Sequence, residues 1–309
     1  MNNNTDKELE SGELRVEREI TLNTQTHNVQ LIFDYEPHLV DIIVTAALDR
    51  NVARGDRIFD EYHRLADQIY LLPISQRENG VQNLQAYYFI KLGLKDAFER
   101  TFAEFPELTT LHSPLSTVMV SPSDKEEGCF LNKVGSPQDK EKLGILVKIR
   151  PARFVDPDSM ARLLRHELLH LVDVLDPDFK YPVEGDASID DAILLSRYAL
   201  LWNISVDARL LRQGRETERG MEYYRAEFDA QFRKLTADER GKIFNHLWNG
   251  ERPTHIELIS WAKDPSLLSK QLLATSRSTP LPGSQCPLCK FPSYNWIFGD
   301  KISGGVAAT

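Results

Sequence analysis

Residues 157–176 are the most constrained segment of the sequence, because their signals all favour one amphipathic helix. Asp156 is a typical N-terminal capping residue, and Pro157 suits the first helical position. At about 100° per residue, one side of such a helix is apolar. That side carries Met160, Leu164, Leu168, Leu171 and Leu175. The opposite side carries His166 and His170, so the pattern predicts a helix that is buried along one side and presents both histidines on the other.

The string His166-Glu167-Leu-Leu-His170 places two imidazoles four residues apart. That spacing is one helical turn, or about 5.4 Å along the axis, so both rings can reach one metal ion. Glu167 is turned by about 100° from His166 and can reach a water molecule on that ion without binding the ion itself. The spacing therefore favours a metal site with a neighbouring carboxylate. The alternative is two surface histidines beside an ordinary helical glutamate.

These residues resemble the zincins, the zinc peptidases that share a His-Glu-x-x-His helix. The resemblance covers His166, Glu167 and His170, and it places the β-like run 144–149 at the edge strand that aligns substrate. It implies that His166 and His170 bind Zn²⁺ and that Glu167 is the general base toward a zinc-activated water. The implied function is a zinc-dependent metallopeptidase, a hydrolase that acts on a peptide or protein substrate.

A catalytic zinc usually has three protein ligands and one open position, so a third donor is expected. Asp207 is the favoured candidate, because it lies among apolar residues in a helix predicted over 188–214. A buried carboxylate there needs a cation or hydrogen bonds to compensate it, and an arginine is the alternative partner. The chain resembles zincins whose third ligand is a carboxylate on a second helix, often in an Asn-Glu pair. Here Asn203-Ile204 lacks that glutamate, which leaves Asp207 as the nearest substitute.

Asp176 is a second candidate for the third ligand. It occupies the last position of His-Glu-x-x-His-x-x-Gly-x-x-His/Asp, the metzincin pattern. Asp173 stands where that pattern has a glycine, and Pro177 follows Asp176 directly. The same residues therefore fit the end of a helix.

Cys129 is a third candidate, in the string Glu-Gly-Cys-Phe-Leu over 127–131. Together with the His-Glu-x-x-His helix, this string resembles peptide deformylase, which implies a metal amidase with Cys129 as third ligand. Four positions depart from the pattern of that family: Phe130, Leu131, Arg165 and Leu169. A buried thiol without metal is the other interpretation of Cys129. The non-enzymatic alternative for the whole chain is a helical binding protein with a vestigial site.

Asp173 and Arg209 lie close in sequence to the expected ligands. Asp173 follows His170 by three residues, so its carboxylate can orient an imidazole or remain in solvent. Arg209 follows Asp207 by two residues and can orient a ligand, contact an oxyanion or form a salt bridge. The sequence leaves these alternatives open.

The pair Cys286-Pro-Leu-Cys289 suggests a separate, structural zinc site. Its spacing looks like one knuckle of a zinc ribbon, and a closed site of that kind needs four ligands. The chain has 3 cysteines in all, so no second pair can complete the site. Free or redox-sensitive thiols are the alternative.

The predicted fold class is α+β and mostly helical, zincin-like, with a small sheet beside the helix of 157–176. Residues 1–13 are expected to form a disordered tail. Residues 14–275 are expected to form the catalytic domain, which begins with a helical layer. Residues 276–309 have the composition of a linker, followed by the cysteine knuckle and a tail.

The expected elements follow from the spacing of apolar residues. Alternation over 14–33 suggests a pair of strands, and helical spacing over 37–105 is broken near 51–55 and 73–80. Further β-like runs occur at 116–120 and 144–149, on either side of the polar segment 121–142. Helices dominate again from 157 to about 263.

Charge and hydropathy exclude some classes of partner. The chain has 37 Lys and Arg against 46 Asp and Glu, a net charge of −9, which argues against binding to a nucleic-acid backbone. No run approaches the roughly 18 apolar residues that a membrane span needs. The polar, acidic start lacks the pattern of a secretory signal, so a cytoplasmic location is expected.

Overall fold

The computed structural model describes residues 31–53, 57–109, 115–133, 143–182 and 191–267, and the pairs 284–285 and 292–293. Its helices are α1 (Pro37–Ala53), α2 (Ile58–Tyr70), α3 (Ile74–Lys91), α4 (Asp96–Ala103), α5 (Pro157–Leu175), α6 (Ala192–Arg212), α7 (Met221–Gln231), α8 (Ala237–Asn249) and α9 (His255–Lys263). Its strands are β1 (Ile32–Tyr35), β2 (Leu115–Pro122), β3 (Gly128–Lys133), β4 (Leu143–Ile149), β5 (Ser284–Gln285) and β6 (Pro292–Ser293). The fold is therefore α+β and mostly helical, as the sequence predicts.

The main sheet has four strands in the order β1-β2-β4-β3. β1, β2 and β4 are parallel, and β3 runs antiparallel to β4 with Cys129 opposite Val147. Alternate residues of β4 are buried in the core, namely Ile145, Val147 and Ile149. This alternation matches the pleat of a strand that buries one face more completely than the other.

The expectation that 144–149 forms the edge strand is wrong, because β4 lies between β2 and β3. The edge beside α5 is formed by β3 instead. β3 falls inside the segment that the sequence analysis assigned as polar, since its residues Gly-Cys-Phe-Leu-Asn-Lys show no clear alternation. Its assignment as a strand depends on antiparallel pairing with the next strand, β4, which the pattern within 128–133 does not record.

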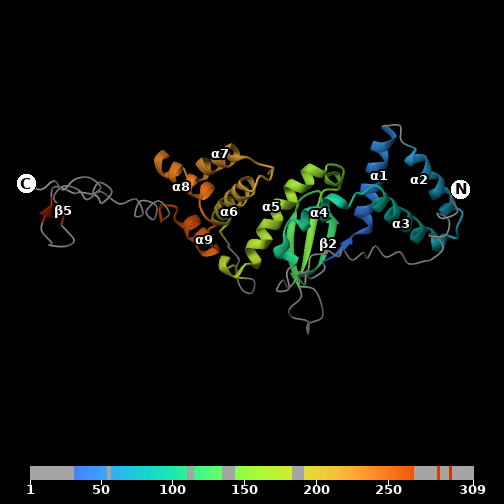
Figure 1. The fold of residues 1–309 in the computed structure, drawn as a ribbon, viewed down its shortest axis with the longest axis horizontal. Helices are drawn as coiled ribbons and strands as arrows, with labels where there is room; N and C mark the ends of the chain where they lie inside the picture. Colours follow the sequence, from blue (N-terminus) through green and yellow to red (C-terminus); the bar gives the residue numbers. More distant parts are fainter. Residues whose placement is uncertain are drawn as a thin grey trace, which may run out of the picture.

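Helix α5 lies between the sheet and the helices α6–α9 (Figure 1). Its apolar side joins the core formed by the sheet and α1–α4. A second core is built by α6–α9. Helix α6 contributes to both, with Val206 and Leu210 in the first core and Ile204 and Ala208 in the second. The two cores therefore meet along α5 and α6.

The helical layer before β2 has one break that was not predicted, between α3 and α4 at residues 92–95. Residues 74–80 belong to α3, so the break expected near 73–80 is shorter than predicted. Gly80 is explained by packing, because a Cβ there would lie 2.8 Å from Ile69 Cγ2 of α2. The glycine lets two helices approach closely and does not end one.

The ends of α5 and α6 follow their capping residues. The Asp156 side chain accepts a hydrogen bond from the backbone N–H of Ser159, and α5 ends at Leu175. Asp191 caps α6 by accepting from two backbone N–H groups. Gly214 follows the end of α6 and has φ 74°, a left-handed conformation that glycine adopts readily and that commonly ends a helix. The start expected near 188 lies outside the described residues.

Several expectations concern residues that the structure does not describe. These are the tail over 1–13, most of the first strand pair, the linker, and both Cys286 and Cys289. The short strands β5 and β6 pair antiparallel on either side of these two cysteines in sequence. Among the helices that the structure describes, none has the length and apolar character to span a membrane.

Truncating α5 on its apolar side tests this packing. Leu168 is 0% exposed in the first core, so Leu168→Ala should lower the free energy of unfolding by about 2–5 kcal/mol in urea denaturation. Leu195→Ala is the matched control, because Leu195 is 50% exposed and its truncation should cost less than about 0.5 kcal/mol. Equal losses at both positions would contradict the described burial of α5.

Candidate metal and catalytic site

The two histidines of α5 face each other across one helical turn. Nε2 of His166 lies 3.2 Å from Nε2 of His170, and the ring centroids are 4.7 Å apart. The helical spacing of four residues therefore brings the two nitrogen atoms to a common point, as the sequence predicts.

Asp207 of α6 contacts the other nitrogen of His166. Its Oδ1 lies 2.6 Å from His166 Nδ1, and its Oδ2 accepts a 2.6 Å hydrogen bond from the Tyr224 hydroxyl. Burial lowers the pKa of His166, but the hydrogen bond to Asp207 and its charge outweigh that effect and raise the pKa. The carboxylate thus holds the imidazole from the side away from His170.

His170 is enclosed by two residues of α6. The Asn203 side-chain oxygen lies 3.0 Å from His170 Nε2, and the Trp202 ring meets the imidazole edge-on with centroids 4.3 Å apart. Burial and the charge of His166 place the pKa of His170 well below its usual value. His170 is therefore held in the neutral form, which is the form that binds metals.

Glu167 points toward the edge strand of the sheet. Its Oε2 accepts a 3.2 Å hydrogen bond from the backbone N–H of Cys129 on β3. A Cβ at Gly128 would lie 3.2 Å from the same oxygen, so the glycine leaves room for the carboxylate. Burial raises the pKa of Glu167, and the charge of His166 and the Cys129 hydrogen bond offset this only in part.

Asp173 does not contact an imidazole directly and is not in solvent. It is 0% exposed and accepts hydrogen bonds from both Nη atoms of Arg209, at 2.8 and 2.5 Å, and from Trp202 Nε1 at 2.8 Å. Arg252 approaches the same carboxylate at 3.4 Å. Arg209 therefore forms a salt bridge with Asp173, and Trp202 lies between Asp173 and His170, contacting both.

The other expected third ligands lie apart from the histidine nitrogens. Asp176 caps the end of α5 and pairs with Arg252 at 2.7 Å. Burial, then the charge of Glu167, raises the pKa of the Cys129 thiol well above its usual value, so it is not poised as a thiolate. Among the residues with described positions, no three His, Cys, Asp or Glu side chains form a group that could hold a metal ion.

A cleft of about 360 Å³ opens beside His166, whereas His170 is not among its lining residues. Its walls come from α5, α6, α7 and the segment before α7. They include His166, Glu167, Asn203, Asp207, Glu218, Arg219, Tyr223 and Tyr224. The site is thus open to a ligand, and it offers polar groups together with the two tyrosine rings.

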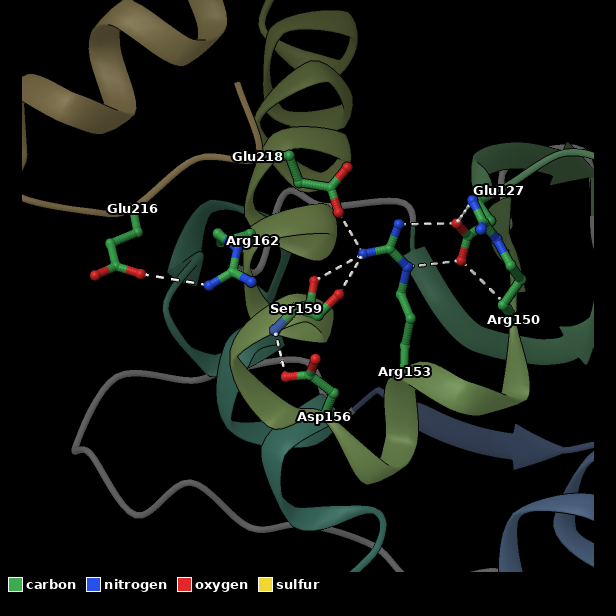
Figure 2. A network of polar contacts seen from close by, with 8 residues as sticks. All are labelled: Glu127, Arg150, Arg153, Asp156, Ser159, Arg162, Glu216 and Glu218. Atoms are coloured by element: carbon green, nitrogen blue, oxygen red, sulfur yellow. Dashed lines mark hydrogen bonds and ion pairs between the residues drawn. The ribbon is translucent and has the colours of Figure 1, made fainter. Parts of the chain in front are cut away.

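Arg153 connects three segments around this site, as Figure 2 shows. It donates hydrogen bonds at 2.8 Å to both oxygens of Glu127, which precedes β3, and to Ser159 at the start of α5. It also pairs with Glu218, in the segment before α7. This network fixes the start of the edge strand relative to α5 and to the wall of the cleft.

The two imidazoles have the spacing of a pair of zinc ligands. The bond between Asp207 and His166 Nδ1 leaves Nε2 as the free nitrogen, and its lone pair can bind a cation. Two ligands of one zinc ion, each at about 2.1 Å, lie roughly 3.4 Å apart in a tetrahedral site. The separation of 3.2 Å between the two Nε2 atoms is close to that value.

Sequence reasoning missed three groups at this site. One of them is Tyr224, whose hydroxyl donates to Asp207. Asn203 was noted only for the absence of a following glutamate, and Arg153 not at all. A usable signal was present for one of them, because Asn203 and Asp207 are four apart on α6, as His166 and His170 are on α5.

Comparison with models of known protein families gives no match, and neither curated proteins nor solved structures match the chain. The function is therefore argued from the geometry of the site.

The pairing of Glu127 predicts a pH-dependent contribution to stability. Burial raises the pKa of Glu127, but hydrogen bonds from Arg153 and Arg150 outweigh burial and lower the pKa below its usual 4.5. Its stabilising effect should be complete above about pH 4.5 and be lost as the pH falls through the lower folded pKa. Measured by urea denaturation between pH 3 and 7, Glu127→Gln should differ most from wild type at the upper end.

The neighbouring Glu126→Gln is the matched control, because Glu126 is exposed. It removes the same charge from the same segment and should leave the pH profile of wild type unchanged. A constant difference between wild type and Glu127→Gln over the whole range would contradict the assignment of Glu127.

Proposed function

We propose that this protein is a zinc-dependent hydrolase of peptide bonds, with His166 and His170 as zinc ligands and Glu167 as the general base. The observation that carries the proposal is the 3.2 Å separation of the two Nε2 atoms on α5, with the neighbouring Glu167 lining the same cleft as His166. The resemblance of the His-Glu-x-x-His helix to the zincins supports it.

The surroundings favour the neutral, metal-binding form of His170, whereas zinc must displace a proton from His166, because Asp207 raises the pKa of that ring. Asp207 binds Nδ1 of His166 and so directs the lone pair of Nε2 toward His170. Burial favours neutral His170. When bound here, zinc would lower the pKa of a water molecule and polarise the scissile carbonyl.

Glu167 is positioned for proton transfer. In the proposed reaction its carboxylate takes a proton from water as the water oxygen bonds to the carbonyl carbon. As the C–N bond breaks, Glu167 passes that proton to the leaving nitrogen, so the carboxylate is regenerated. The Cys129 N–H holds Oε2 during this exchange and keeps the side chain beside β3.

The substrate is expected to be an extended peptide because of the strand next to the site. β3 is the edge of the sheet and adjoins α5, so its outer backbone groups can pair with a peptide strand. The cleft on the α6 and α7 side of α5 is lined by two tyrosines and by side chains of both charges. These surfaces favour a peptide over a compact small molecule.

Replacing the base tests the proposal. Glu167→Gln should lower the cleavage rate of a peptide library, followed by mass spectrometry, by about 10²-fold or more, because general base catalysis is lost. Zinc content, measured by elemental analysis, should remain that of wild type, since Glu167 is not a ligand.

Glu222→Gln is the matched control, because Glu222 is exposed on α7 and lies outside the lining of the cleft. It should cleave like wild type. Full activity in Glu167→Gln would refute the role of Glu167, and zinc-loaded wild type that cleaves no peptide would refute the peptidase.

A further inference from the structure

We propose that the third protein donor at this site is the side-chain oxygen of Asn203, and that Asp207 acts only through His166. The inference rests on the proposed zinc site and specifies how that site is completed. It assigns an uncharged ligand where a carboxylate was expected from the sequence.

Three atoms converge on one point between α5 and α6. His166 Nε2 and His170 Nε2 are 3.2 Å apart, and Asn203 Oδ1 lies 3.0 Å from His170 Nε2. Ligands of one zinc ion at about 2.1 Å are separated by roughly 3.0–3.4 Å, depending on the coordination geometry. Both separations fall in that range, which is the geometric basis for assigning Asn203 Oδ1 as the third ligand.

Asp207 is excluded from the same point by its own partners. One oxygen is bound to Nδ1 of His166, and the other accepts the Tyr224 hydroxyl, each at 2.6 Å. The two ring nitrogens of an imidazole point in different directions, so an oxygen on Nδ1 is not directed at an ion on Nε2. The Asp207 carboxylate therefore has the role of orienting and polarising the ring.

The spacing on α6 explains how one helix supplies both groups. Asn203 and Asp207 are four residues apart and lie on the same side of α6, toward α5. Asn203 meets the second histidine and Asp207 the first. The two residues on α6, one helical turn apart, therefore contact the two histidines on α5, which are also one turn apart.

An amide ligand has a consequence for the metal. Two neutral imidazoles and a neutral amide leave the full charge of the ion uncompensated by its direct ligands. Zinc binds a carboxylate oxygen more strongly than an amide carbonyl oxygen. Carbonyl oxygens are better ligands for harder ions such as Mg²⁺ and Ca²⁺. The wild-type site should therefore bind zinc more weakly than the same site with a carboxylate at position 203.

Zinc affinity of the purified full chain, measured by competition with a chromophoric chelator, tests the assignment. Asn203→Asp keeps the shape of the side chain and adds a charge, so it should bind zinc at least about tenfold more tightly than wild type. Asn203→Ala removes the oxygen and should bind at least about tenfold more weakly. The gain from Asn203→Asp should persist in an Asn203→Asp/Asp207→Asn double variant, because Asp207 is not the ligand.

Asn245→Asp is the matched control, because it adds the same charge at an exposed position on α8 and should leave the affinity unchanged. Far-ultraviolet circular dichroism of each variant without zinc establishes that it is folded. Should Asn203→Asp not fold, Asn203→Ala alone decides the question.

Wild-type affinity in Asn203→Ala, or no gain in Asn203→Asp, would overturn the assignment of Asn203. If Glu167→Gln still abolished cleavage in that case, the proposed peptidase would stand without it. Conversely, the expected changes in zinc affinity with no cleavage by wild type would leave Asn203 as a ligand and refute the peptidase. Absence of zinc binding in both wild type and Asn203→Asp would refute both.

Discussion

Two carboxylates buried between α5 and α6 determine how these helices sit against each other. Asp173 on α5 is 0% exposed and Asp207 on α6 is 1% exposed. Each is compensated by groups of the opposite helix, Asp173 by Arg209 and Trp202, and Asp207 by His166. Removing one partner of a buried charge costs about 3–5 kcal/mol, so neither helix can rotate or slide without breaking such a contact. The position of both imidazoles depends on this constraint.

The apolar contacts alone do not provide that precision. Helix α6 is apolar on nearly all sides and contributes to both hydrophobic cores, so many rotations about its axis would bury a similar area. The directional bonds of Asp173 and Asp207 select one rotation among them. Next to this interface, Arg153 binds both Glu127, which precedes β3, and Glu218, which precedes α7. These contacts fix the position of β3, so the Cys129 N–H stays within hydrogen-bonding distance of Glu167.

The sequence predicted the parts of this arrangement that leave local signals. Helix α5 was specified by its cap, its apolar side and its spacing of histidines, and the burial of Asp207 followed from its apolar neighbours. It could not be predicted which atom would compensate Asp207, because the partners come from α5 and α7 and meet it only in the folded chain. β3 was missed because a short edge strand with little alternation becomes recognisable only through its pairing with β4. The contact of Asn203 with His170 was not predicted, because an uncharged side chain in a helix does not stand out, and only its four-residue spacing from Asp207 pointed to it.

Tyr224 contacts both the cleft and the carboxylate that binds His166. Its ring lines the cleft, while its hydroxyl donates to the carboxylate behind His166. An occupant that draws the hydroxyl toward itself leaves more negative charge on Asp207, and the imidazole becomes a more electron-rich donor. Two successive hydrogen bonds thus connect the lining of the cleft to the imidazole of His166.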